Sequence, residues 1–206
     1  MEPLSTEALL AIEAAMPDRL RAMVRMMAGT GLRPGEAVGV TLDRVDFLRR
    51  TLRVDRQLLL TRPPSFGPPK TASSARTVPL PQAVLDALAA HMATFPPRAP
   101  GLLFTEPDGS PLNRDRVTKA FRRAVETAGA PTTARLHDVR HYYASLLIRH
   151  GESVKVVQAR LGHASASETL DTYSHLWPDS DDTTRAAVDS VLGGAVADSL
   201  RTAEPR

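Results

Sequence analysis

Two arginines, two histidines, a lysine and a tyrosine in this 206-residue chain have the side chains that metal-free chemistry on a phosphodiester requires. His137 and Arg140 are three residues apart, so on a helix they project from one face. His163 and Tyr173 follow them within residues 136–176, a stretch that holds five of the six histidines of the chain. The first arginine and the lysine lie far upstream. The candidate catalytic set is Arg33, Lys70, His137, Arg140, His163 and Tyr173.

Each residue type in this set meets a different need of phosphoryl transfer. An Arg guanidinium grips phosphate oxygens bidentately and keeps its charge, so two of them can stabilise a five-coordinate transition state as a metal does elsewhere. A Tyr phenol can attack phosphorus and hold it as an ester, although its ordinary pKa of about 10 calls for nearby cations and a base. A Lys can protonate the leaving sugar oxygen. Because the set contains no carboxylate pair, we predict no metal and no cofactor.

Other interpretations of these histidines and tyrosines stay open at this point. His137 and His141 form an H-x-x-x-H pair, which on a helix can hold zinc. Asp138 stands where the metalloprotease motif has Glu, however, and no third ligand is evident. Tyr142 and Tyr143 are alternative nucleophiles, but they share the apolar side of their helix, which favours core packing for at least one of them.

Single residues of the set also have ordinary explanations. Arg33 follows a Gly-rich turn and precedes a Pro-Gly pair, and taken alone it is as well explained as a surface arginine. Lys70 is equally compatible with an ordinary loop lysine. His91, His150 and His175 have no partner pattern, and we expect all three at the surface.

Helices are the main elements that must position these residues. Apolar side chains recur at helical spacing, while Ser, Asn, Pro and Gly mark the starts and ends. The basic helix after Asn113 is expected to bury Val117, Phe121 and Val125 and to turn its cationic face toward phosphates or solvent. N-caps are expected at Ser5 or Thr6, Asn113, Ser153 and Ser167. Helices are expected at about residues 6–16, 18–28, 34–38, 81–93, 114–128, 136–150, 154–161, 168–176 and 179–199.

Short β-like runs replace the helical pattern between residues 45 and 79. Strands are expected at residues 45–47, 51–54, 57–60 and 77–79. The intervening loop, residues 62–71, is rich in Pro and Gly, so it should be irregular and exposed. We predict one small antiparallel sheet with Lys70 at the tip of its last hairpin. The fold class is therefore α+β, mainly α-helical: a helical catalytic domain with a small antiparallel sheet.

The composition is that of a globular protein with an uneven distribution of charge. There is no Cys, which excludes disulfides and zinc sites built on thiolates. No stretch resembles a signal peptide or is apolar for long enough to cross a bilayer, so we expect a cytoplasmic protein without membrane contact. Residues 111–165 hold ten Lys or Arg against four Asp or Glu, whereas residues 166–206 hold three against eight. A basic middle beside an acidic tail favours a polyanionic partner such as nucleic acid.

Four motifs together resemble the tyrosine recombinases, or phage-type integrases, over about residues 4–178. TGLRPGEAVGV is similar to the first-arginine motif of the family at Arg33, and PPKTASSARTVPL to its lysine hairpin at Lys70. LHDVRHYYAS resembles the H-x-x-R motif at His137 and Arg140. RLGHASASETLDTYSHL resembles the late LGH and nucleophile motifs. Any one of these is weak, but all of them in order and at family spacing are specific.

The resemblance implies that the chain cleaves and rejoins DNA. Tyr173 would attack the scissile phosphate, form a 3′-phosphotyrosyl link and free a 5′-hydroxyl, and Lys70 would be the general acid toward that hydroxyl. A 5′-hydroxyl of another duplex would then attack the ester, giving strand exchange through a Holliday junction. Neither metal nor ATP would be needed, because the ester stores the bond energy.

The resemblance also assigns roles to the remaining residues. Arg33 and Arg140 would clamp the phosphate oxygens, with Glu36 supporting the first of them. His137 would assist proton transfer, and His163 would donate a hydrogen bond to a non-bridging oxygen.

The expected partner is double-stranded DNA, with a monomer in isolation and a tetramer on DNA. We expect residues 1–180 to be the catalytic domain and residues 181–206 a C-terminal helical tail, which in this family often packs on a neighbouring protomer. The N-terminal core-binding domain that completes a clamp around DNA is expected to be absent from this chain, so that it binds DNA weakly alone. Two competing functions are relaxation of DNA by a type IB topoisomerase-like enzyme and catalytically silent DNA binding.

Overall fold

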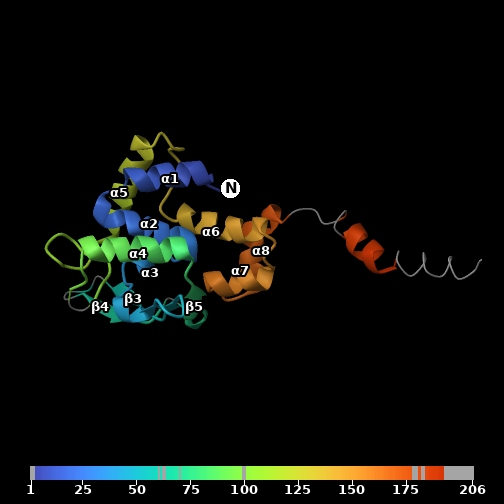
Figure 1. Cartoon of the computed structure of the whole chain (residues 1–206), viewed down its shortest axis with the longest axis horizontal. Helices are drawn as coiled ribbons and strands as arrows, with labels where there is room; N and C mark the ends of the chain where they lie inside the picture. The colour runs from blue at the N-terminus through green and yellow to red at the C-terminus, as the bar shows by residue number, and fades with distance from the viewer. Residues whose placement is uncertain are drawn as a thin grey trace, which may run out of the picture. The chain divides into compact units, whose positions relative to one another are not determined.

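A computed structural model describes residues 3–59, 61, 64–69, 71–98, 101–177, 181 and 184–192. The chain divides into two compact units, Met1–Ser174 and His175–Arg206. The first unit holds all helices and strands up to α8 and is mainly helical (Figure 1). In chain order the elements are α1 (Thr6–Ala15), α2 (Asp18–Thr30), α3 (Pro34–Ala37), the 3-10 helix η1 (Leu42–Arg44), β1 (Val45–Asp46), β2 (Thr51–Val54), β3 (Gln57–Leu59), β4 (Ser65–Gly67), η2 (Ala72–Ser74), β5 (Arg76–Pro79), α4 (Gln82–Thr94), α5 (Arg114–Thr127), α6 (Asp138–Arg149), α7 (Val154–Leu161), α8 (Ala166–Tyr173) and η3 (Ser174–Leu176).

Helix α2 is the central helix of the first unit. It packs against both α4 and α6, and α1 packs against α5 (Figure 1). Its methionines at positions 23, 26 and 27 are fully buried and fill the core. The helix ends at Gly31, whose left-handed backbone (φ 66°) places its amide on the carbonyl of Met27.

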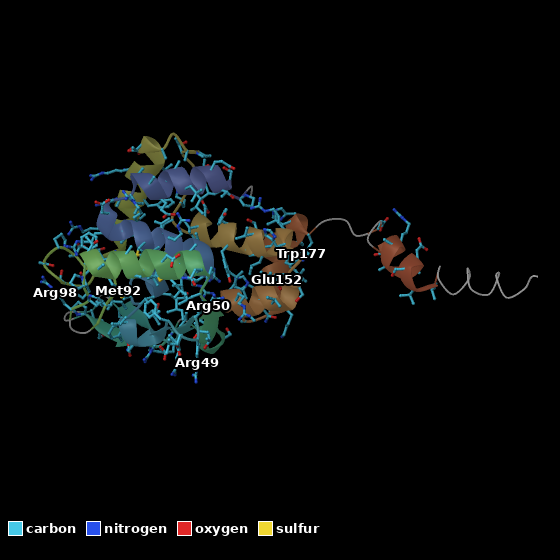
Figure 2. All side chains as sticks on the ribbon, viewed as in Figure 1. Arg49, Arg50, Met92, Arg98, Glu152 and Trp177 are labelled. Atoms are coloured by element: carbon cyan, nitrogen blue, oxygen red, sulfur yellow. The ribbon has the colours of Figure 1, made fainter. Side chains whose placement is uncertain are left out.

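The strands form two small antiparallel sheets rather than the single sheet expected. One has the order β1-β2-β5, with Thr51 opposite Pro79 and Val54 opposite Arg76. The other pairs β3 with β4, so part of the Pro- and Gly-rich loop is a strand that the sequence pattern did not predict. The turn between β1 and β2 carries Arg49 and Arg50, which are both exposed, and Arg49 projects from the edge of the molecule in Figure 2. The α+β, mainly helical class is confirmed.

Most of the predicted caps are present. Ser5 accepts from the amide of Ala8, and Asn113 accepts from that of Asp115. Ser153 starts α7, which ends at the left-handed Gly162. The prediction for α8 was wrong by two residues, because Ser165 rather than Ser167 is its N-cap.

The hydrophobic core confirms the amphipathic pattern of α5 and corrects one histidine. Val117, Phe121 and Val125 are all buried, as predicted. His91, expected at the surface, is instead buried on α4, where its Nε2 lies 2.9 Å from the carbonyl oxygen of Leu103. Its ring also contacts the ring of Phe104, at 4.8 Å between centroids.

In the second unit, residues 184–192 are helical, and three of their apolar side chains are exposed. The helix predicted for residues 179–199 extends beyond the described residues on both sides. No described helix is long and apolar enough to cross a membrane.

Candidate active site

Arg33 lies between α2 and α3 and is the N-cap of α3. Its backbone N–H donates to Glu36 Oε2 at 2.9 Å, and its Nη1 donates to Glu36 Oε1 at 3.1 Å. The same Nη1 donates to Ser74 Oγ at 3.2 Å, which ties α3 to the segment before β5. The side chain is 27% exposed, so part of the guanidinium faces solvent and is free to meet an anion.

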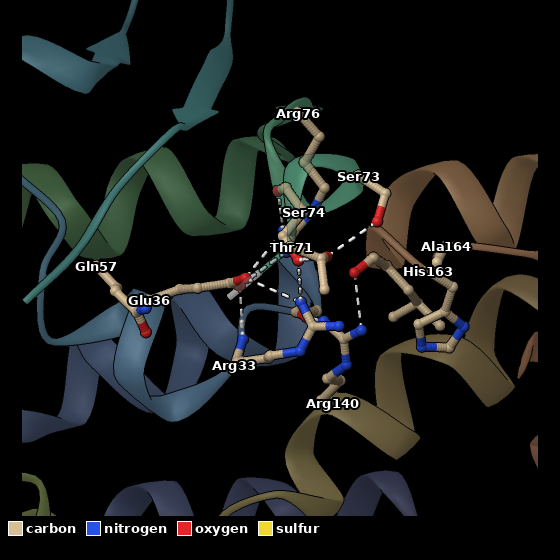
Figure 3. Close-up of polar contacts among 12 residues, drawn as sticks. Arg33, Glu36, Gln57, Thr71, Ser73, Ser74, Arg76, Arg140, His163 and Ala164 are labelled. Carbon is tan, nitrogen blue, oxygen red and sulfur yellow. Dashed lines mark hydrogen bonds and ion pairs between the residues drawn. The ribbon is translucent and has the colours of Figure 1, made fainter. Parts of the chain in front are cut away.

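Arg76, which the sequence reasoning did not single out, holds three parts of the site together. It donates to both oxygens of Glu36, at 3.1 and 2.9 Å (Figure 3). It also donates to the carbonyl of Arg160 at 2.8 Å. Burial works to raise the pKa of the Glu36 carboxyl, but the hydrogen bonds and charges of Arg76 and Arg33 outweigh it, so this pKa lies below its usual range. Glu36 is therefore a carboxylate that fixes two guanidinium groups.

Arg140 is the most deeply buried charged side chain of the site, at 2% exposure. Nη1 donates to the carbonyl of Gly31 at 2.6 Å and Nη2 to that of Leu161 at 2.7 Å. Burial lowers the pKa of Arg140 to about 10, and the charges of Arg33 and Arg76 add to this effect. The group stays cationic at neutral pH, and the crowding of positive charge here is relieved when an anion binds.

His163 follows the left-handed end of α7 and is buried beside α8. Its Nδ1 is 2.9 Å from Thr169 Oγ1, and its Nε2 is 3.7 Å from Glu168 Oε1. Burial, followed by the charge of Arg140, lowers the pKa of His163 to about 4. The ring is therefore neutral at pH 7.

Tyr173 is the last residue of α8 and is 4% exposed. Its hydroxyl is 2.7 Å from Nδ1 of His141, and its ring is parallel to that of His163 with 6.5 Å between centroids. Burial raises the pKa of Tyr173 to about 12, against the lowering effect of Arg140 and Arg33. The phenol is thus protonated at neutral pH and sits within the electrostatic reach of both candidate clamps.

The two histidines of the H-x-x-x-H pair face different parts of the site. His137 lies with Arg33 in the lining of a hollow between α3, α5 and the start of α6. His141, one turn along α6, reaches Tyr173 instead. The two rings meet edge to face, with 4.9 Å between centroids. The sequence reasoning set His141 aside as half of a possible zinc pair, and no local signal pointed to its partner 32 residues away.

The other interpretations of these residues find no support in the geometry. Among the described residues, no three His, Asp or Glu side chains gather closely enough to hold a metal ion. Tyr142 is buried, with its hydroxyl 3.1 Å from Thr6 Oγ1. Tyr143 is buried against the backbone of Gly31, and burial raises its pKa. Both tyrosines are core residues.

Lys70 lies outside the described residues, so its predicted place at a hairpin tip stays a prediction. The described residues next to it approach the site. Pro69 lines the hollow that Arg33 and His137 share, and Thr71 Oγ1 is 2.8 Å from the same Ser74 hydroxyl that accepts from Arg33.

Cationic side chains surround this hollow. Arg114 at the start of α5 and Arg135 before α6 line it together with Arg33. The exposed helix α5 therefore presents its first arginine to the site. Lys119 and Arg123 line a separate groove against the N-terminal end of α2.

Comparisons with known proteins identify the family of this chain. Residues 2–179 match the description "Phage integrase family", and the chain belongs to that family. It is 30% identical over 201 residues to a "Tyrosine recombinase XerC-like" protein of Caldanaerobacter subterraneus subsp. tengcongensis, covering 86% of this chain and 51% of that protein. It is 33% identical over 162 residues to "Tyrosine recombinase XerD" of Corynebacterium glutamicum, covering 79% and 50%. The chain thus spans about half the length of these relatives.

Solved structures share the fold. The Tn1549 transposon integrase in complex with transposon right end DNA superposes with a TM-score of 0.78 at 24% identity, covering 93% of this chain and 66% of that one. A lambda integrase dimer bound to a core site gives a TM-score of 0.62 at 18% identity, covering 81% and 59%.

Proposed function

We propose that this chain is the catalytic part of a site-specific DNA recombinase, which cleaves and rejoins duplex DNA through a 3′-phosphotyrosyl intermediate. The observation that carries the proposal is a buried tyrosine whose pKa, raised by burial, is lowered in part by the charges of two guanidinium groups, of which one is buried and the other partly exposed. A scissile phosphate placed between Arg33 and Arg140 would meet two cations that are already fixed by their own hydrogen bonds, and preorganised charge of this kind stabilises a phosphoryl transition state.

Each remaining residue has a place in this proposal. Tyr173 attacks phosphorus, and Lys70 protonates the departing 5′ oxygen. His163, neutral and held by Thr169, keeps Nε2 for a non-bridging phosphate oxygen. His137, at the hollow, assists proton transfer near the phosphate.

A recombinase accounts for the relatives better than the two competing functions do. The curated relatives are named tyrosine recombinases, and the Tn1549 integrase structure holds transposon-end DNA. A silent DNA-binding module has no need of a buried tyrosine within the electrostatic reach of two arginines, and none of the relatives named above is a topoisomerase. We extend the proposal to duplex DNA as partner, a monomer that becomes a tetramer on DNA, and action in the cytoplasm.

The cleavage step is tested with a nicked suicide duplex made from the DNA that flanks the gene, in which the 5′-hydroxyl fragment diffuses away after cutting. We expect a covalent protein–DNA adduct on a denaturing gel, and none with Tyr173→Phe. No adduct with the wild-type chain, or an equal adduct with the Phe variant, would reject this mechanism.

The division into a catalytic domain, residues 1–180, and a tail, residues 181–206, belongs to the same proposal. The tail would pack on a neighbouring protomer and regulate cleavage there. Its exposed Val188, Val191 and Leu192 support this, because they offer an apolar strip to a partner. Deletion of residues 181–206 should change adduct formation on an assembled two-site duplex. Unchanged cleavage on that duplex would argue against the regulatory role.

A further inference from the structure

Among the described residues, the shortest contact of the Tyr173 hydroxyl is with His141. The 2.7 Å distance from Nδ1 to the phenolic oxygen is that of a strong hydrogen bond. The rings are tilted by 58° with 5.5 Å between centroids, so the imidazole addresses the hydroxyl rather than stacking on the ring. The contact joins the first turn of α6 to the last residue of α8.

The nucleophile needs a proton acceptor. With a pKa of about 12, only about one Tyr173 in 10⁴ to 10⁵ would be ionised at pH 7.5. An approaching phosphate adds negative charge and makes spontaneous ionisation less favourable still. A base that takes the proton during attack removes this penalty.

The neighbouring groups are committed elsewhere. His163 directs Nδ1 to Thr169, and its ring is parallel to the Tyr173 ring at 6.5 Å, so it does not point a nitrogen at the hydroxyl. Arg140 carries only donors, and two of them are held by the carbonyls of Gly31 and Leu161. Among the described residues, His141 alone presents an acceptor to the tyrosine oxygen.

The state of His141 suits this role. Burial lowers its pKa, with the charge of Arg140 adding to the effect and that of Asp138 opposing it, so the ring is neutral at pH 7. A neutral imidazole with its proton on Nε2 offers the Nδ1 lone pair to the phenol.

We propose that His141 is the general base that accepts the phenolic proton of Tyr173 during DNA cleavage and returns it during rejoining. The inference rests on the proposed strand-cleavage function and adds a residue to it. As the Tyr173 oxygen bonds to phosphorus, its proton passes to Nδ1, the bond from phosphorus to the 5′ oxygen breaks, and the general acid protonates that oxygen. In rejoining, a 5′-hydroxyl attacks phosphorus and gives its proton back to the deprotonated general acid, the tyrosine–phosphorus bond breaks, and the phenolate recovers its proton from the His141 imidazolium.

The first test measures single-turnover adduct formation on the suicide duplex with His141→Gln. Gln keeps a hydrogen-bonding side chain of similar length but cannot take up a proton. We expect a rate ~100-fold or more below wild type. His150→Gln, the same exchange at the exposed C-cap of the same helix, is the matched control and should cleave at the wild-type rate.

Two chemical changes separate a base from a residue that only holds the tyrosine in place. A fluorinated tyrosine at position 173 has a more acidic phenol and depends less on a base, so it should shrink the His141→Gln deficit by roughly tenfold. A 5′-bridging sulfur in the DNA leaves without a proton and removes the need for the general acid alone. The His141→Gln deficit should persist on this substrate.

The outcomes are distinct. A wild-type chain that forms no adduct defeats the proposed function itself. A wild-type adduct with an equal rate for His141→Gln overturns the role of His141. A deficit that fluorotyrosine leaves unchanged shows a positioning role only, and a deficit that bridging sulfur removes places the histidine on the leaving group. Either result also overturns the proposal.

Discussion

The Arg76 guanidinium donates two hydrogen bonds to the Glu36 carboxylate, from Nη2 to Oε2 at 2.9 Å and from Nη1 to Oε1 at 3.1 Å. The two side chains are 5% and 6% exposed. This pair joins β5 to α3, and a third hydrogen bond from Arg76 reaches the carbonyl of Arg160 near the end of α7. Glu36 also accepts a hydrogen bond from Arg33. The ion pair therefore links Arg33 to α7, the helix that precedes His163. It is a bidentate, buried contact of the kind that fixes geometry.

Replacing Arg76 with Ala should therefore be costly, because it leaves the Glu36 carboxylate buried with one partner fewer. We expect a loss of about 3–5 kcal/mol in the free energy of unfolding, measured by urea denaturation. Arg53→Ala on the adjacent strand is the matched control. Its side chain is 67% exposed in a pair with Asp55, so its loss should stay below about 1 kcal/mol. Equal losses for the two variants would contradict the structural role of Arg76.

Replacing Gly31 with Ala should disturb both stability and catalysis. A methyl group there would lie 2.4 Å from Cδ1 of Tyr143, in a left-handed backbone, and the Gly31 carbonyl is an acceptor of Arg140. We expect overpacking to add ~2 kcal/mol to the backbone strain and adduct formation to fall.

Gly129→Ala isolates the backbone strain. Gly129 has a similar φ of 62°, but no atom would meet its added methyl within 4 Å. If Gly31→Ala lowers the free energy of unfolding no more than Gly129→Ala does, the close packing of Tyr143 against Gly31 is contradicted.

Stability should fall as the pH is lowered from 6.5 to 5. Burial lowers the pKa of His91, His137, His141 and His163, so these rings take up protons at a lower pH in the folded chain than their unfolded counterparts do near pH 6.5. Protonation of these histidines below pH 6.5 then favours the unfolded state and lowers the free energy of unfolding. Urea unfolding at pH 7.5 and 5.0 measures the difference.

The variant His163→Gln should show a shallower pH dependence, because it lacks the histidine whose pKa is lowered to about 4. Equal unfolding free energies of the wild-type chain at the two pH values would mean that the histidines are not desolvated as described.

DNA affinity should depend on Arg114 more than on other cations of α5. Arg114 lines the hollow with Arg33 and Arg135, whereas Arg122 is 75% exposed and 3.9 Å from Glu126. Arg114→Ala should weaken duplex binding and reduce the slope of log affinity against log salt by about 1. Arg122→Ala should change the slope less. Equal slopes for the two variants would mean that Arg114 does not contact a DNA phosphate.

Much of the fold followed from local signals. Helix α7 begins after Ser153 and ends before Gly162, as predicted. A side-chain cap and a left-handed glycine both act within one turn of the helix. Strand β4 was missed because Pro and Gly dominate its neighbourhood, and only its pairing with β3 reveals it. His91 was misplaced for a similar reason, since its burial depends on Leu103 and Phe104, which lie beyond a run of prolines.

Residue types and spacing nominated one part of the candidate site, and contacts nominated the rest. Arg33, His137, Arg140, His163 and Tyr173 were singled out by type and spacing, and the structure places Arg33 with His137 in one hollow and the His163 ring parallel to that of Tyr173. The roles of Arg76 and His141 depend on partners that are 40 and 32 residues distant in the sequence, and no pattern of composition or period reports such pairs.

The central claim is that Tyr173 becomes the covalent link to DNA, and mapping the adduct tests it most directly. The adduct formed on the suicide duplex is digested with nuclease and protease, and the peptide that carries the remaining nucleotide is identified by mass spectrometry. The chain has three tyrosines. We expect the nucleotide on Tyr173 alone. A nucleotide on Tyr142 or Tyr143, which are buried in the core here, would contradict it.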